Sequence, residues 1–311
     1  MLQRILIGPV CAVLLVGCTG DVPPETAAAE VPAASVTRAP SAAEVCQIIN
    51  SGTPLPAQID ETSGLAHSRL DDGIFWTHND SGDNAELFAL DADGQMVARV
   101  DVSGAEFIDW EDIESGPCDS GSCLYLGDTG DNDEERGFVT IYRIPEPATD
   151  AASATATALN ARYPAGPRDA EALFVLPSGD IYLVTKGRYD SIDLFHYPMP
   201  HQPGETVMLE HIKELAPEPA NDADRVTAAT ATPNGEWVGI RTSNALHLYR
   251  TSDLISPQPA QAIVADLSPL GEEQGEAVVI DNDGSVWLTS EAGGNNQLPQ
   301  WSQLSCTLPG T

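Results

Sequence analysis

The chain has 311 residues and a formal net charge of −33 at pH 7. A surface this acidic repels nucleic acid and anionic lipid head groups, so we expect neither as a partner. Hydrophobic residues make up 42% of the chain, enough to bury a core, and this argues against disorder over its whole length.

The N-terminus has the pattern of an export signal. Arg4 precedes an apolar run over residues 5–16, which is too short to span a bilayer. The run ends in Leu-Val-Gly-Cys at residues 15–18, which resembles the lipobox of bacterial lipoproteins. The resemblance implies that a signal peptide of residues 1–17 is removed and that Cys18 carries diacylglycerol. An ordinary signal peptide with an incidental cysteine is the alternative.

The same resemblance indicates where the protein resides. Thr19, rather than Asp, follows the modified cysteine, and in Gram-negative lipoproteins that is similar to an outer-membrane address. We therefore expect an exported protein, lipid-anchored at the outer membrane or on a periplasmic or extracellular face. Residues 18–44, rich in Ala, Pro, Thr, Ser and Glu, are predicted to be a spacer because such a composition cannot bury a core.

From residue 45 to 311 the pattern changes to short strands separated by turns. Apolar runs such as Ile181-Tyr-Leu-Val184 alternate with turn dipeptides such as Asp93-Gly94, and helical periodicity is weak. Five segments align in register, each beginning a four-strand unit roughly fifty residues long. This period predicts an all-β fold, a five-bladed β-propeller, with six blades as the alternative. The aligned first positions are Ser63, Glu111, Glu171, Thr227 and Glu276.

The last unit lacks a fourth strand, and Val45–Ile49 lies outside any unit. We predict that this N-terminal segment supplies the missing strand and closes the ring. The mature domain has four cysteines in an oxidising compartment. Cys118 and Cys123 enclose a natural turn and are paired, which leaves Cys46 and Cys306 to join the two ends of the chain. Zinc binding is the rival, but the sequence contains no Cys-x-x-Cys.

The first strand of a propeller blade lies nearest the axis, so equivalent positions converge there. The aligned set carries three carboxylates and two hydroxyls, with no Lys or Arg expected at that level. Crowded carboxylates must protonate, pair or hold a cation, and hard oxygen donors favour Ca²⁺. Neutralisation by Arg168, Arg225 and water is the alternative. Two residues later in each strand, Leu65, Ile113, Leu173, Ala229 and Val278 are predicted to form an apolar plug.

The order Ser, Glu, Glu, Thr, Glu resembles the calcium ring of five-bladed calcium-activated nucleotidases of the apyrase kind. That resemblance implies a central Ca²⁺. A second resemblance, to secreted bacterial propellers of unassigned function, rests on residues 109–112, 126–132 and 142–147, and it implies no activity.

Residues before the first strands and after the second strands are predicted to form a ligand-binding mouth. This set mixes carboxylates, carboxamides and scarce cations, which favours an anionic small molecule or an envelope partner, although turn chemistry explains the Asn and Asp equally well. The candidates are Glu61, Asp109, Asp169, Arg225, His78, Asn79, Asp80, Asp128, Lys186, Arg188 and Arg241. We expect a monomeric calcium-binding lipoprotein. The alternatives are a calcium-dependent hydrolase of nucleotides or phosphoesters and a lactonase or phytase-like esterase.

Overall fold

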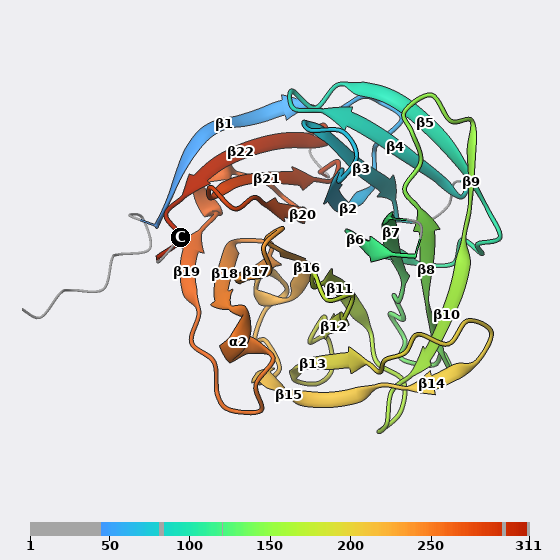
Figure 1. The fold of residues 1–311 in the computed structure, drawn as a ribbon. Coiled ribbons are helices and arrows are strands. Elements are labelled where there is room, and N and C mark those ends of the chain that lie inside the picture. Colours follow the sequence, from blue (N-terminus) through green and yellow to red (C-terminus); the bar gives the residue numbers. More distant parts are fainter. Residues whose placement is uncertain (1–44, 81–83, 120, 294–296, 310–311) are drawn as a thin grey trace, which may run out of the picture. The chain divides into compact units, whose positions relative to one another are not determined.

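The computed structural model describes residues 45–80, 84–119, 121–293 and 297–309, and these fold into five sheets that stand in a ring (Figure 1). The predicted five-bladed β-propeller is therefore confirmed. The signal peptide, Cys18 and the spacer lie outside the described residues.

Each blade is a four-stranded antiparallel meander whose first strand is innermost. Blade 1 comprises β2 (Thr62–His67), β3 (Ile74–Asn79), β4 (Glu86–Asp91) and β5 (Met96–Ser103). Blade 2 comprises β6 (Trp110–Cys118), β7 (Gly121–Asp128), β8 (Val139–Pro145) and β10 (Thr157–Arg162). Blade 3 comprises β11 (Ala170–Val175), β12 (Ile181–Thr185), β13 (Ile192–Tyr197) and β15 (Glu210–Ala216). Blade 4 comprises β16 (Val226–Ala231), β17 (Trp237–Thr242), β18 (Ala245–Arg250) and β19 (Ile263–Asp266).

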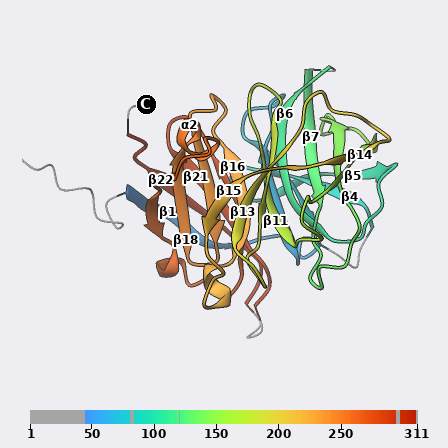
Figure 2. The same ribbon diagram turned by 90° about the horizontal axis from the view of Figure 1, so that it is seen from below.

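Blade 5 combines both ends of the domain. It contains β20 (Gly275–Ile280), β21 (Ser285–Ser290), β22 (Gln300–Cys306) and, as its outer strand, β1 (Cys46–Pro54). Figure 2 shows β1 alongside β22 at this closure. Cys46 faces Cys306 in the register and forms a disulfide with it. A second disulfide, Cys118–Cys123, closes the β6–β7 hairpin, so both predicted pairs are present.

Two short strands that the sequence pattern did not indicate link neighbouring blades. The connection from β8 to β10 contains β9 (Ser153–Thr155), which pairs in parallel with β5 of blade 1. The connection from β13 to β15 contains β14 (Thr206–Met208), which pairs in parallel with β10 of blade 2. Segments of three residues show no period, so only tertiary pairing reveals them.

The core is divided into five hydrophobic clusters, each between two adjacent blades. This corrects the predicted apolar plug. Its five members are buried, but each belongs to a different cluster: Leu65, Ile113, Leu173, Ala229 and Val278. They therefore hold neighbouring blades together instead of meeting on the axis.

From residue 46 onward, the described helical structure consists of short turns. These are α2 (Thr251–Leu254) and two 3-10 turns at Asp222–Asp224 and Ser268–Leu270. Within the described ranges, none of the helices has the length and apolar composition needed to cross a bilayer.

Candidate functional site

Every innermost strand carries a β-bulge near its N-terminal end. The ladders between first and second strands skip the positions predicted to line the axis: Ser63, Glu111, Glu171, Thr227 and Glu276. A bulge leaves its residue unpaired and re-aims the side chain. The same irregularity, repeated in five blades, therefore brings these side chains to one level of the ring.

Four of these five residues line a cavity of about 140 Å³ whose exposed lining is polar. Six of its side chains are carboxylates and one is a lysine, so the site is strongly negative. It is lined by Ser63, Asp80, Asp109, Glu111, Asn132, Glu171, Lys186, Gln274, Glu276 and Glu291.

Three buried carboxylates form the most compact part of the site. Glu111, Asp169 and Glu171 each place an oxygen within 4.8 Å of the others. Asp169 is only 1% exposed, and its Oδ1 accepts a hydrogen bond from the backbone N–H of Asp131 at 3.0 Å. Its Oδ2 is buried without a hydrogen-bond partner. A buried carboxylate oxygen that accepts no hydrogen bond and lies beside two further carboxylates is a suitable position for a cation ligand.

The two hydroxyls of the predicted ring also contact the backbone. Ser63 Oγ donates to the carbonyl oxygen of Glu111 at 2.5 Å, and Thr227 Oγ1 donates to that of Glu276 at 2.9 Å. Each hydroxyl thereby links the innermost strands of two neighbouring blades. Their oxygen lone pairs remain available as acceptors.

Lys186 changes the expected charge at this level. It was predicted to lie in the mouth, with no cation among the ring carboxylates, but its Nζ forms an ion pair with Glu171. Burial acts to lower the pKa of Lys186, yet the charges of Glu171, Glu111 and Asp169 outweigh burial and the pKa is raised. Lys186 is therefore protonated and neutralises Glu171, and no ion pair with Glu111 is formed within the described residues.

Burial raises the pKa of three carboxylates in the site. Burial, followed by repulsion from Glu171 and Asp109, raises the pKa of Glu111 well above its usual value. Burial and the charge of Glu291 do the same to the pKa of Glu276. The pKa of Glu171 is raised to about 7 by burial, even though Lys186 lowers it. A divalent cation would relieve this repulsion and restore the ionised forms.

A loop after β7 holds the carboxylates in place. Asp131 accepts hydrogen bonds from the backbone N–H groups of Glu135 and Arg136 at 2.9 and 2.8 Å, which fold the loop onto itself. Gly130 lies directly against the Glu111 and Asp109 carboxylates, where an added Cβ would overlap their oxygens. Glycine is thus required here for close approach, which explains part of the motif over residues 126–132.

The other predicted mouth cations are already paired. Arg241 is fully buried and binds Glu272 and the carbonyl oxygens of Ala277 and Thr289, so it is part of the scaffold and its assignment to the mouth is corrected. Arg225 pairs with Asp222 at 2.8 Å.

Arg188 and Arg168 are also engaged. Arg188 Nε lies 3.4 Å from Asp169 Oδ2, and Arg168 contacts Asp193 at 3.1 Å. Neither Arg168 nor Arg225 contacts the ring carboxylates, so Lys186 takes the neutralising role considered for them.

Of the candidates predicted at the end of β3 and just after it, only one lines the cavity. Asp80 lines the cavity. His78 is fully buried, stacks edge-on against Trp110, and has its pKa lowered to about 4 by burial, so it is neutral. Asn79 is buried and donates to the carbonyl oxygen of Gln58 at 3.1 Å. These two side chains stabilise the blade instead of facing the mouth.

Two further candidates for the mouth, Glu61 and Asp128, have different environments. Glu61 is exposed, and its charge contributes, after burial and Asp80, to raising the pKa of Glu291 to about 7. Asp128 is 1% exposed and forms an ion pair with Arg136 at 2.9 Å, so it anchors the loop after β7.

Two buried acidic side chains on β6 were not predicted from the sequence to be part of the site. Asp112 is fully buried, and its Oδ2 accepts from the backbone N–H groups of Leu173 and Ala229 at 3.0 and 2.9 Å. Glu114 accepts from Thr230 Oγ1 and the Ala231 N–H at 2.9 and 3.0 Å. These bonds join blade 2 to blades 3 and 4 across the axis. The sequence did indicate acidic residues inside a buried strand. The direction of their side chains could not be predicted, because the bulge before Asp112 shifts the register.

A larger cavity of about 540 Å³ adjoins the carboxylates on the side of blades 3 to 5. Its lining includes Glu171, Lys186, Thr227 and Glu276 from the site, together with polar loop residues such as Asn244. This volume is within the range of pockets that hold small molecules. A ligand in it would lie directly beside the carboxylates.

The fold and site define a β-propeller with a carboxylate-lined axial cavity. No protein-family model matches the chain, and no curated protein matches it by sequence. Among solved structures, it is similar to a PQQ-bound aldose sugar dehydrogenase from Streptomyces coelicolor, with 11% identity and a TM-score of 0.52 over 86% of this chain and 100% of that one. A calcium-binding regucalcin from Agrobacterium tumefaciens matches with 11% identity and a TM-score of 0.43, over 84% of this chain and 95% of that one. At this identity the likeness to the dehydrogenase supports the propeller fold alone.

Proposed function

We propose that this protein binds a divalent cation, Ca²⁺ by the chemistry of its ligands, and uses it to hold an oxygen-rich ligand in the axial mouth. The observation that carries the proposal is the cluster of three buried carboxylates, Glu111, Asp169 and Glu171, in which Asp169 Oδ2 accepts no hydrogen bond and has Arg188 Nε 3.4 Å away. One lysine cannot balance the carboxylates that surround it.

Glu111, Asp169 and Glu171 would supply the first ligands, with Glu276 and Ser63 in the same cavity. Carboxylate and hydroxyl oxygens favour Ca²⁺, whose shell of six to eight oxygens leaves positions for water or a ligand. A bound cation would supply a Lewis acid centre toward the 540 Å³ cavity.

Binding is better supported than hydrolysis. A phosphoester hydrolase needs cations free to stabilise a phosphate, whereas Lys186, Arg188, Arg225 and Arg241 all contact carboxylates. The hydrolase and esterase alternatives predict turnover, so a panel of nucleotides, phosphoesters and lactones with and without Ca²⁺ tests them directly.

The metal proposal is tested by calorimetric titration of the chelator-treated protein with Ca²⁺ and by native mass spectrometry. We expect one ion per chain, with binding lost in Glu171→Gln and strengthened in Lys186→Gln, since that lysine competes for the same carboxylate. Glu205→Gln, at an exposed position, is the matched control. If neither the wild type nor Lys186→Gln binds Ca²⁺ at millimolar concentration, the proposal is wrong.

We further propose that the domain is exported and tethered by lipid on Cys18. The two disulfides support maturation in an oxidising compartment, because such bonds rarely persist in the cytosol. Cys18→Ser is expected to move the protein from the membrane fraction to the soluble fraction. Unchanged fractionation of this variant would exclude the lipid tether.

A further inference from the structure

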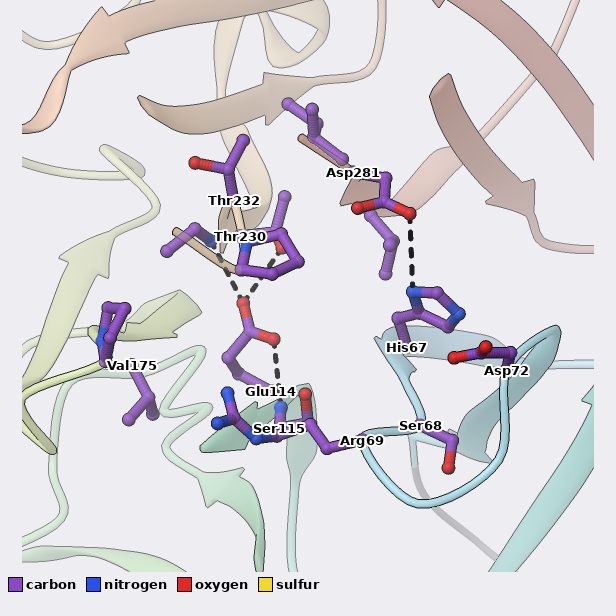
Figure 3. A pocket seen from close by; sticks show the side chains of 15 residues that line it. His67, Ser68, Arg69, Asp72, Glu114, Ser115, Val175, Thr230, Thr232 and Asp281 are labelled. Carbon is purple, nitrogen blue, oxygen red and sulfur yellow. Dashed lines mark hydrogen bonds and ion pairs between the residues drawn. The ribbon is translucent and has the colours of Figure 1, made fainter. Parts of the chain in front are cut away.

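A second cavity, of about 270 Å³, is formed by the far ends of the innermost strands and the turns that follow them (Figure 3). All five blades contribute to it. It is lined by His67, Ser68, Arg69, Asp72, Glu114, Ser115, Val175, Pro177, Thr230, Ala231, Thr232, Pro233, Val279, Ile280 and Asp281.

This second cavity is distinct from the carboxylate site. The two cavities have no lining residue in common. Between Glu111 and Glu114 on β6 lies Asp112, fully buried and bonded to the backbones of blades 3 and 4. A ligand in the second cavity would therefore not touch the proposed metal ligands.

Glu114 offers a buried acceptor in this cavity. It is 5% exposed, and Figure 3 shows its carboxylate between Ser115 and Thr230. Its Oε2 accepts two hydrogen bonds, whereas its Oε1 accepts only one, from the Ser115 N–H at 2.9 Å. A carboxylate oxygen has two lone pairs, so Oε1 can accept one more donor. Asp281 and Asp72 add further negative charge to the lining.

Arg69 is the one Lys or Arg side chain in the lining. Its backbone N–H binds Glu146, but within the described residues its guanidinium forms no ion pair or hydrogen bond. An unpaired guanidinium is unexpected in a chain with a net charge of −33. It is therefore available for a carboxylate that arrives with a ligand, which it can bind in a bidentate manner.

His67 provides an additional polar contact. Its ring stacks on Phe75 with centroids 4.8 Å apart, and its Nδ1 lies 4.0 Å from Asp281 Oδ2. Its Nε2 is buried without a partner. The stacked ring is held in place, so this nitrogen can contribute to recognition.

The rest of the lining is apolar and limits the size of a ligand. Val175, Val279 and Ile280 form aliphatic surface, with Pro177 and Pro233 beside them. A volume of about 270 Å³ is below the usual range for drug-sized ligands. The cavity therefore suits a compact molecule that has both charges and an aliphatic body.

We infer that this second cavity binds a small zwitterion of the α-amino acid class, with the ammonium group on Glu114, the carboxylate on Arg69 and an aliphatic side chain against Val175, Val279 and Ile280. Each part of the ligand corresponds to a lining group that is otherwise incompletely used. The inference does not depend on the proposed cation.

Three probes that share the same branched aliphatic group separate the contributions: L-leucine, isopentylamine, which lacks the carboxylate, and 4-methylpentanoate, which lacks the ammonium. We expect calorimetry to detect binding of leucine, and each truncated probe to bind at least about tenfold more weakly, because each loses a charge-assisted hydrogen bond. No binding of leucine, or equal binding of either truncated probe, would overturn the inference.

Variants locate the binding and separate it from the metal site. Arg69→Gln changes an exposed side chain that forms no hydrogen bond or ion pair among the described residues, and it should weaken leucine binding by about tenfold or more while the fold is retained. Glu114→Gln should do the same, and its thermal unfolding curve reports whether it is folded. Glu171→Gln should lose Ca²⁺ binding and keep leucine binding. Leucine binding that survives both Arg69→Gln and Glu114→Gln would place the ligand elsewhere and refute the site.

Discussion

Glu146, in the motif over residues 142–147, is predicted to be a principal stabilising link between blades 1 and 2. It is 8% exposed, and its carboxylate accepts from Ser68 Oγ and Ser122 Oγ, both at 2.5 Å. It also accepts from Trp76 Nε1 at 3.3 Å and from the Arg69 N–H at 3.1 Å. One side chain thus satisfies donors from β3, from the turn after β2 and from the β6–β7 hairpin.

Substituting Glu146 should lower stability in a graded way. In Glu146→Gln the serine hydroxyls can rotate to accept from the new amide, so mainly the charge assistance is lost, about 1–2 kcal/mol. In Glu146→Ala the buried Trp76 N–H and the part-buried Arg69 N–H lose their acceptor, at roughly 1–3 kcal/mol each, so we expect a total of about 4 kcal/mol. For a domain of this size, 1 kcal/mol corresponds to about 2–4 °C in Tm.

The assay is differential scanning calorimetry of the wild type, Glu146→Gln, Glu146→Ala and the exposed controls Glu205→Gln and Glu205→Ala. We expect Tm to decrease from the wild type to Glu146→Gln and again to Glu146→Ala, while both Glu205 controls unfold near the wild-type temperature. If Glu146→Ala unfolds at the same temperature as Glu205→Ala, the carboxylate does not stabilise the contact between the blades.

Three further predictions follow from the site and the closure. Gly130→Ala should abolish Ca²⁺ binding but preserve the circular dichroism spectrum, because the added methyl overlaps the Glu111 and Asp109 carboxylates; unchanged affinity would contradict the packing. Glu114 has a pKa raised from 4.5 to about 7 by burial, so the folded state holds its proton more tightly than the unfolded state, and the metal-free protein should lose stability as pH rises through that range. Glu114→Gln should flatten this dependence by up to about 1.4 kcal/mol per pH unit, measured by urea unfolding, and an identical slope would exclude it. Loss of the Cys46–Cys306 disulfide should lower Tm more than loss of the Cys118–Cys123 disulfide in Cys118→Ser/Cys123→Ser. The reason is that the Cys46–Cys306 bond closes a far longer loop of the chain.

The sequence predicted the ring because the blades repeat. The same eight-residue offset from an axial position to a turn glycine recurs at Glu171, Thr227 and Glu276, and the structure places a bulge at each. The predicted closure by β1 is also confirmed. It could be predicted because the last unit lacked a fourth strand, while the segment over residues 45–49 belonged to no unit.

What could not be predicted depends on side-chain reach. Lys186 follows a second strand, yet its long side chain extends inward to Glu171. Asp112 has the opposite strand phase from Glu111, but the bulge between Trp110 and Asp112 shifts the register and lets it bond to two other blades. The spacing of residues in the sequence does not determine in which direction a lysine side chain extends. It also does not determine how many residues a bulge contains.

The pairing of β1 with β22 has a consequence for how the domain assembles as it is synthesised. β1 comes first among the described strands, whereas its partner β22 comes last. Until β22 is present, β1 has an unpaired edge and Cys46 carries a reactive thiol, and both features promote aggregation and mispairing. The Cys46–Cys306 disulfide can therefore form only after every blade has been made, and a product truncated before β22 would keep a free thiol at Cys46.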